Sequence, residues 1–374
     1  MASHNNAAAA IVIAVIAASL SAPAGFILGK NQTQRAWEAQ RAAEIERNRS
    51  ELQNLTIQKG PIYVIGHLSP DSDTVCSAIA YAELLNKLGY DARPAIAGPL
   101  NRETEFILEH AGVPVPEILD QAGGENIVLV DHSDYAQSVD GMKEANIISI
   151  IDHHGAAGII NHNPFLYTAK PVAAAASAVW DCYNRYGVEI DEKTAEVLLG
   201  AILSDSRNLS YSTVTELDRQ AADALQKRAG IIERTEYYEK LRRAALSRDG
   251  MSDMEILLAD SRKYETESYR YAISCVTAID EADAKAVAEQ LKDDLSEAEK
   301  LQEVDLMYLV ISYFPGKTGI NFTIPSSELA KEIYITAFPD DPFDGTMFIK
   351  DPSMSRKAGF VPAISGVLNS YPHE

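Results

Sequence analysis

Four apolar runs in this sequence each end in histidine or acidic side chains, and this repeated ending constrains the fold more than any other feature. Helical patterns separate the runs, so we interpret them as buried strands of an open α/β sheet. In such sheets, functional groups gather beyond the carboxyl ends of the strands. The runs end at His67 followed by Asp71 and Asp73, at Asp131 and His132, at Asp152, His153 and His154, and at Ser204 and Asp205.

Imidazole and carboxylate groups together suit Mn²⁺, Mg²⁺ or a similar divalent ion. The first run alone has another explanation, because Ser72 or Asp73 could cap the helix that follows it. Recurrence at four run ends favours a metal centre. Two ions about 3.5–4 Å apart can lower the pKa of a water and neutralise charge in an in-line phosphoryl displacement. The candidate ligands are His67, Asp71, Asp73, Asp131, His153 and Asp205.

The motifs GHLSPDSDTVCSA, VDH, DHH and SDS occur in this order and spacing and resemble the DHH phosphoesterase superfamily. They resemble the family II, manganese-type inorganic pyrophosphatases more closely. KPVAAAASAVW after DHH and SRKAGFVPAI near the C-terminus extend the resemblance. It covers residues 61–368 and nothing before them.

The resemblance implies hydrolysis of inorganic pyrophosphate with two or more divalent ions, Mn²⁺ first and Mg²⁺ or Co²⁺ as alternatives. It matches each of the six candidates to a metal ligand, with Asp131 and Asp205 as bridges. His154 matches a phosphate-contacting histidine that could protonate the leaving group. Asp152 and His132 match residues that orient ligands, although a purely structural role is equally open for them.

The formal net charge of −21 means that a polyanionic substrate needs local cations besides the metals. Arg262 falls where the resembling family has a phosphate-binding lysine, and Lys263 is adjacent. Arg356 and Lys357 match the family's basic pair. Arginine in place of lysine exchanges a point charge for a planar fork. A second departure is Ser133, where the family has asparagine; a third is the lysine-free segment after Asp205.

The fold class we predict is α/β: a mainly parallel sheet with helices on both faces, followed by a smaller α/β cap of the DHHA2 type. Glu103, Glu109 and His110 lie on a helix predicted at residues 103–112, and we interpret them as solvated. A hinge would let the cap close and exclude water. The predicted parts are an anchor at 1–30, a stalk at 31–58, the DHH domain at 59–246, the hinge at 247–252 and the cap at 253–374.

Residues 7–28 carry no charge and are long enough to span a bilayer. The basic residues that follow predict an anchor with the catalytic part in the cytoplasm. A cleaved signal peptide with export would explain the small residues SAPA, but residues 1–6 contain no lysine or arginine. A helix packed in an oligomer is also open. Residues 32–55 are rich in helix formers, which we interpret as a solvated stalk.

Composition narrows the classes of protein function that remain open. A chain with this much negative charge is a poor general binder of nucleic acid. Its three cysteines lack the spacing of a zinc site or of a disulfide framework. An exopolyphosphatase or other small phosphoesterase is the alternative enzyme. A membrane-associated assembly protein of low activity is the alternative outside the enzymes, although it has no reason to keep six ligands. The resemblance also implies a homodimer.

Overall fold

The computed structural model describes residues 33–160, 163–314 and 318–371, and the chain divides into two units, Met1–Tyr238 and Glu239–Glu374. Unit 1 contains a six-stranded, wholly parallel sheet in the order β3-β2-β1-β4-β5-β6. The order runs outward from β1 and β4, so the point where the winding reverses lies between them. This confirms the predicted mainly parallel sheet. The strands are β1 (Ile62–Ile65), β2 (Ala92–Ile96), β3 (Glu117–Ile118), β4 (Asn126–Val130), β5 (Asn146–Asp152) and β6 (Leu166–Ala169).

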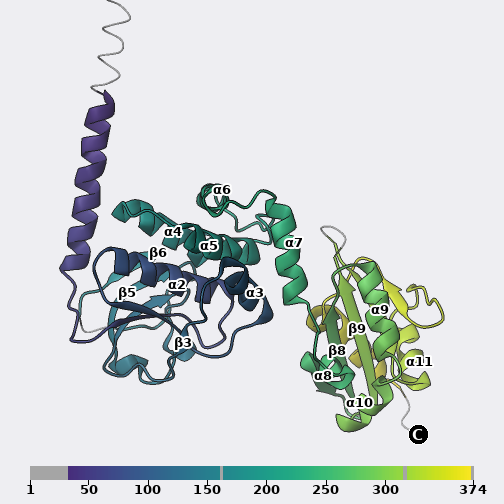
Figure 1. Ribbon diagram of the computed structural model, residues 1–374. Coiled ribbons are helices and arrows are strands. Elements are labelled where there is room, and N and C mark those ends of the chain that lie inside the picture. Colours follow the sequence, from purple (N-terminus) through teal and green to yellow (C-terminus); the bar gives the residue numbers. More distant parts are fainter. Residues whose placement is uncertain (1–32, 161–162, 315–317, 372–374) are drawn as a thin grey trace, which may run out of the picture. The chain divides into compact units, whose positions relative to one another are not determined.

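Helices cover one face of this sheet. Helices α2 and α4 contact the strands, and α5 packs on α2 and α4 (Figure 1). On the opposite face the strands pack against Ala122, from the connection between β3 and β4, and against Val139 and Met142, from the connection between β4 and β5. The second connection contains only the short 3-10 turns η1 (Tyr135–Gln137) and η2 (Met142–Glu144). The expectation of helices on both faces is therefore wrong for the described residues of unit 1. Its helices are α2 (Ser72–Lys87), α3 (Arg102–Ala111), α4 (Ala175–Tyr186), α5 (Glu192–Asp205), α6 (Glu216–Ala229) and α7 (Arg234–Ala245), the last of which crosses into unit 2.

The fourth apolar run is a helix, which corrects its interpretation as a strand. It lies in α5, which begins after Asp191, whose side chain accepts a hydrogen bond from the Thr194 amide at 2.9 Å. The run from Val197 to Leu203 is buried throughout, among α2, α3, α4 and α6. A helix buried on every side shows no polar stripe, so its apolar run has no period that separates it from a buried strand. Asp205 is thus the last residue of a helix.

The described part of the N-terminal helix (residues 33–53) docks at its C-terminal end onto the rest of unit 1. Asn48 Nδ2 donates to the carbonyl of Arg185 at 3.0 Å, and Arg49 Nε donates to that of Tyr186 at 2.8 Å. These carbonyls end α4, where the helix itself supplies no donors. Leu52 is buried. Residues 33–44 are exposed, and their role as a stalk stays a prediction, whereas the solvated interpretation is wrong for the docked end.

The proposed anchor at residues 7–28 lies outside the described residues. Among the helices that the structure does describe, none combines the length and the apolar character needed to cross a bilayer.

Unit 2 is a second α/β unit with a five-stranded mixed sheet in the order β11-β10-β9-β8-β7, in which only β8 and β9 pair in parallel. Helices α8, α9 and α10 pack on one face, and α11 and α12 on the other. Its elements are α8 (Asp253–Ala259), β7 (Ser261–Glu265), β8 (Arg270–Thr277), α9 (Glu281–Leu291), α10 (Leu295–Leu301), β9 (Leu306–Tyr313), β10 (Ile320–Pro325), α11 (Glu328–Ala337), β11 (Phe348–Lys350), the π-helical turn η3 (Arg356–Phe360) and α12 (Val361–Leu368).

The segment predicted as a hinge, residues 247–252, connects α7 to α8. Arg248 within it is hydrogen-bonded to the side chain of Asp283 and lies 3.4 Å from the carbonyl of Thr277. The division into units falls earlier, after Tyr238. The hinge and the predicted domain boundaries stay predictions.

Candidate metal centre

The first ligands come from the junction of β1 and α2. Gly66 lets the two elements approach, because a Cβ atom there would lie 2.3 Å from Cγ2 of Thr74. Asp71 caps α2 by accepting a hydrogen bond from the Thr74 amide at 2.9 Å, and its other oxygen lies 3.5 Å from Nε2 of His67. One oxygen of this carboxylate therefore caps the helix, while the other faces the candidate site. The capping residue is Asp71, and neither Ser72 nor Asp73 occupies that position.

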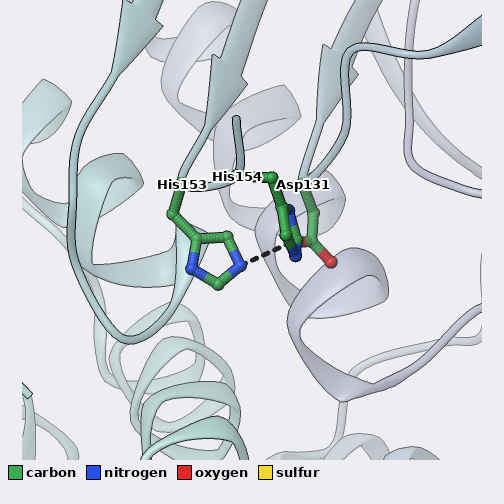
Figure 2. A group of neighbouring side chains, drawn as sticks. All are labelled: Asp131, His153 and His154. Carbon is green, nitrogen blue, oxygen red and sulfur yellow. Dashed lines mark ion pairs between the residues drawn. The ribbon is translucent and has the colours of Figure 1, made fainter. Parts of the chain in front are cut away.

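Asp131 follows β4 and stands between two histidines. Its Oδ1 lies 3.0 Å from Nε2 of His153, which Figure 2 shows directed at the carboxylate, and its Oδ2 lies 3.3 Å from Nε2 of His67. Thr74 Oγ1 donates to Oδ2 at 2.6 Å. The backbone of Asp131 is left-handed, with φ of 64°. Strained backbone of this kind concentrates at functional sites, where the surrounding structure over-determines it.

The remaining ligand candidates are Asp73, His153 and Asp205, and the first two are held by backbone groups at and just before the start of α4. Asp73 is fully buried, and its two oxygens accept hydrogen bonds from the amides of Ala175 at 2.5 Å and Ala176 at 2.8 Å. Free amides at a helix start favour a carboxylate. Nδ1 of His153 lies 3.1 Å from the carbonyl of Val172, which can only accept, so this nitrogen carries the proton and Nε2 faces the site.

All six predicted ligands lie together in two groups. His67, Asp71 and Asp131 form one, and Asp73, His153 and Asp205 the other; within each group the potential ligand atoms lie within 4.8 Å of one another. The contact between Asp131 and His153 joins the groups. Asp205 occurs in one group, so its predicted bridging role stays a prediction. A third arrangement links Asp131, His153 and His154.

The residues fit divalent ions. Oδ1 of Asp131 and Nε2 of His153 are buried and complete no hydrogen bond, although they lie only 3.0 Å apart. Buried polar atoms are expected to have partners. Two such atoms aimed at one point, among oxygen and imidazole donors, match the ligand preferences of Mn²⁺.

The ionisation of these groups reflects the crowded negative charge. Burial lowers the pKa of His67 and His153, but contacts with neighbouring carboxylates outweigh it and raise both values to about 10. Burial and nearby aspartates raise the pKa of Asp205 to about 7. Burial opposes ionisation of Asp131 as well, but the two histidines and Thr74 prevail and lower its pKa. The metal-free centre therefore compensates its carboxylates with protons.

Flanking residues orient the second histidine of the DHH motif. The backbone amide of His154 and its Nδ1 lie 3.0 and 3.1 Å from Oδ1 of buried Asp152. With Nδ1 held, Nε2 is left for another partner, and the side chain is 58% exposed. His132 is buried, and its Nδ1 accepts from the Asp134 amide at 3.4 Å.

Glu103 is the residue that the sequence interpretation missed. It lies in the first turn of α3 and is only partly exposed, and its Oε2 accepts hydrogen bonds from Ser204 Oγ at 2.8 Å and Ser72 Oγ at 3.2 Å. The solvated interpretation is therefore wrong for Glu103. It is also incomplete for His110, whose Nδ1 pairs with Glu196, although both His110 and Glu109 are exposed. Helical spacing gave no signal for these contacts, because they depend on how α3 packs against other helices.

The predicted substrate cations belong to unit 2. Arg356 begins η3 and is fixed by Asp260, with Nη1 donating to its carbonyl at 2.7 Å and Nη2 to its carboxylate at 2.8 Å. Arg262, on β7, lies 3.9 Å from the same carboxylate. Lys263 and Lys357 are exposed.

Comparisons with known proteins agree with this architecture. Residues 61–202 match the model of the DHH family, N-terminal domain, and residues 239–367 match the DHHA2 domain. The manganese-dependent inorganic pyrophosphatase of Bacillus subtilis is 33% identical over 309 residues, which cover 82% of this chain and 98% of that protein. The Methanothrix thermoacetophila protein of the same name is 30% identical with the same coverage. A Methanococcus jannaschii crystal structure, classed with the family II inorganic pyrophosphatases, is 31% identical, covers 82% of this chain and 99% of that one, and has a TM-score of 0.53.

Proposed function

This chain belongs to the family II, manganese-dependent inorganic pyrophosphatases, which are phosphoanhydride hydrolases, and we propose that it splits pyrophosphate at a pair of divalent ions held by six residues of unit 1. One ion would bind to His67, Asp71 and Asp131. The other would bind to Asp73, His153 and Asp205, with Asp131 shared. The observation that carries the proposal is the position of Asp131, which offers one oxygen to each group.

Bound ions of this kind lower the pKa of a water and neutralise charge on the phosphoryl group. The protein contributes the preorganised ligands, and positioning with electrostatic stabilisation carries most of the rate in phosphoryl transfer. Asp73 is held by two backbone amides and His153 by the Val172 carbonyl. His154, oriented by Asp152, would donate a proton from Nε2 to the departing phosphate.

We assign the distal phosphate of the substrate to the cations of unit 2. Arg356 and Lys357 would bind it, with Arg262 or Lys263 in the role that the resemblance gives to lysine. Support comes from Asp260, which already fixes the Arg356 guanidinium and so reduces the entropy lost on binding.

The test is phosphate release by the full chain from pyrophosphate, tripolyphosphate, long-chain polyphosphate and a nucleotide, each with Mn²⁺, Mg²⁺ or chelator. Asp205→Ala is the loss variant. Asp140→Ala, an exposed aspartate outside both groups, is the matched control. We expect Mn²⁺-stimulated turnover of pyrophosphate. Asp205→Ala should abolish this turnover, whereas Asp140→Ala should retain it. Preference for longer chains would make the protein an exopolyphosphatase, and metal binding without turnover would indicate an assembly role.

Membrane attachment through residues 7–28 is a separate proposal, supported by their uncharged sequence and the basic residues after them. Expressed in cells, the full chain should sediment with membranes and resist carbonate extraction, whereas a variant lacking residues 1–30 should not. Recovery of both in the supernatant would contradict the anchor. If the N-terminus of the recovered full chain instead shows cleavage after the SAPA segment, the result would support export. The homodimer that the family suggests is testable on the same samples by sedimentation equilibrium.

A further inference from the structure

Helix α3 lies close to the ends of the two helices that carry metal ligands. It contacts both α2 and α5. Gly200 of α5 permits the approach, since a Cβ atom there would lie 2.9 Å from the side chain of Ile107 on α3. Thr104 of α3 is fully buried at the other contact, beside Ser72. The first turn of α3 is therefore fixed against its neighbours before any metal binds.

Glu103 in this turn connects the two ligand-bearing helix ends. Its Oε2 accepts from Ser72 and from Ser204, at 3.2 and 2.8 Å. Ser72 stands between the ligands Asp71 and Asp73 at the start of α2, and Ser204 immediately precedes Asp205 at the end of α5. Through these two bonds, one oxygen of Glu103 is linked to residues adjacent in sequence to three of the four acidic ligands. The three are Asp71, Asp73 and Asp205.

The Ser72 side of this connection is reinforced by α3 itself. The Ser72 hydroxyl lies 3.0 Å from Oγ1 of Thr104, and Asn101 caps α3 by accepting from the amide and hydroxyl of Thr104 at 2.8 and 2.9 Å. The Ser204 side has only the bond to Glu103 to hold its hydroxyl among the contacts the structure describes. Helix ends fray, so this bond restrains the last turn of α5 where Asp205 lies.

We infer that Glu103 is a positioning residue of the metal centre, whose hydrogen bond to Ser204 holds Asp205 at the spacing from Asp73 that the second ion requires. The inference rests on the proposed metal centre. Residues that orient metal ligands without touching the metal typically change metal affinity about 10–100-fold when they are replaced. Glu103 therefore acts on affinity for the metal.

The experiment is Mn²⁺ titration of the metal-free full chain, with free Mn²⁺ followed by electron paramagnetic resonance. Glu103→Ala should weaken one of the two Mn²⁺ sites about 10–100-fold and leave the other close to wild type. Glu103→Gln, which keeps an accepting oxygen, should bind Mn²⁺ close to wild type. Ser204→Ala should reproduce the alanine defect, and the Glu103→Ala/Ser204→Ala pair should add nothing further. Glu109→Ala, an exposed glutamate of the same helix, is the matched control.

Unchanged Mn²⁺ affinity in Glu103→Ala would overturn the inference. Equal loss in Glu103→Gln and Glu103→Ala would also overturn it, because charge rather than hydrogen bonding would then be responsible. Should Glu103→Ala fail to fold, Ser204→Ala removes a single hydroxyl and decides the matter by the same titration. Absence of Mn²⁺ binding by the wild-type chain would instead refute the metal centre, and the positioning role with it.

Discussion

Nε2 of His153 lies 3.0 Å from Oδ1 of Asp131, and neither atom completes a hydrogen bond. The two side chains come from the ends of adjacent parallel strands, β5 and β4. In the metal-free protein a proton on His153 compensates the carboxylate, and a divalent ion would replace that proton. Metal binding and proton release are therefore linked at this centre.

Mn²⁺ affinity should consequently rise with pH. His67 and His153, whose pKa values are raised to about 10, must lose their protons before Nε2 can bind a metal. Affinity should increase from pH 6 towards pH 9, with release of at least two protons per pair of ions at neutral pH, because Asp205, whose pKa is about 7, adds to the two histidines. Calorimetric titration in buffers of different ionisation enthalpy measures both quantities. Affinity independent of pH, with no proton release, would be incompatible with these histidines as ligands.

The free energy of unfolding of the metal-free protein should change in the opposite direction. Asp205 has its pKa raised to about 7, so the folded state holds this proton more tightly than the unfolded state. The resulting stabilisation is complete below the ordinary value of 3.8 and is lost as pH rises through about 7. The stabilisation that comes from His67 and His153 is complete below their ordinary pKa of 6.5 and is lost as pH rises through about 10.

Urea unfolding in the presence of chelator should therefore give a lower midpoint at pH 8 than at pH 5.5. Asp205→Asn should flatten the acidic part of this dependence, and an unaltered slope would assign it elsewhere.

Arg356→Ala should raise KM for pyrophosphate. Loss of a charged hydrogen-bonding group costs about 1.5–3 kcal/mol, which corresponds to about 10–100-fold. Asp260→Ala should raise KM by less, because the guanidinium keeps its charge but loses its fixed orientation. Steady-state phosphate release measures both variants, and Lys285→Ala, an exposed cation on α9, serves as the control. Arg356→Ala with unchanged KM would remove this residue from the substrate site.

The docked end of the N-terminal helix should contribute stability and leave turnover unchanged. Leu52→Ala should lower the free energy of unfolding by about 2–5 kcal/mol, as expected for a buried leucine. Arg49→Ala should lower it by about 1–3 kcal/mol, since the carbonyls at the end of α4 lose a charged donor. Arg47→Ala is a matched control, because Arg47 is exposed on the same helix. Equal unfolding midpoints for Arg49→Ala and Arg47→Ala would show that this end of the helix is not docked in solution.

The sequence was most informative where chemistry and backbone period coincide. Strands β1, β4 and β5 are short, buried and apolar, and a candidate ligand follows the end of each, so both the parallel sheet and the grouping of five of the six candidate ligands followed from one pattern. Asp205 was found for the same chemical reason, but its element was wrong. The apolar run of α5 is buried from every side, and burial of that kind removes the polar stripe by which a helix is recognised.

Contacts between distant elements could not be predicted. Nothing in a helical pattern distinguishes Glu103, which bonds to Ser72 and Ser204, from exposed Glu109 six residues later. The docking of Arg49 depends on the carbonyls at the end of α4, more than a hundred residues away in the chain. Ser133 is similar. Its hydroxyl accepts from the Ala157 amide at 3.1 Å and from Tyr167 at 3.2 Å, and so links the loop after DHH to β6.

The most direct test of the two-metal account is electron paramagnetic resonance of the full chain loaded with Mn²⁺. We predict two ions per chain with a spin-coupled spectrum, as expected for ions about 3.5–4 Å apart. Asp131→Ala should abolish the coupling, whereas Asp140→Ala should retain it. A single bound ion, two uncoupled ions, or a coupled spectrum that survives in Asp131→Ala would contradict the account.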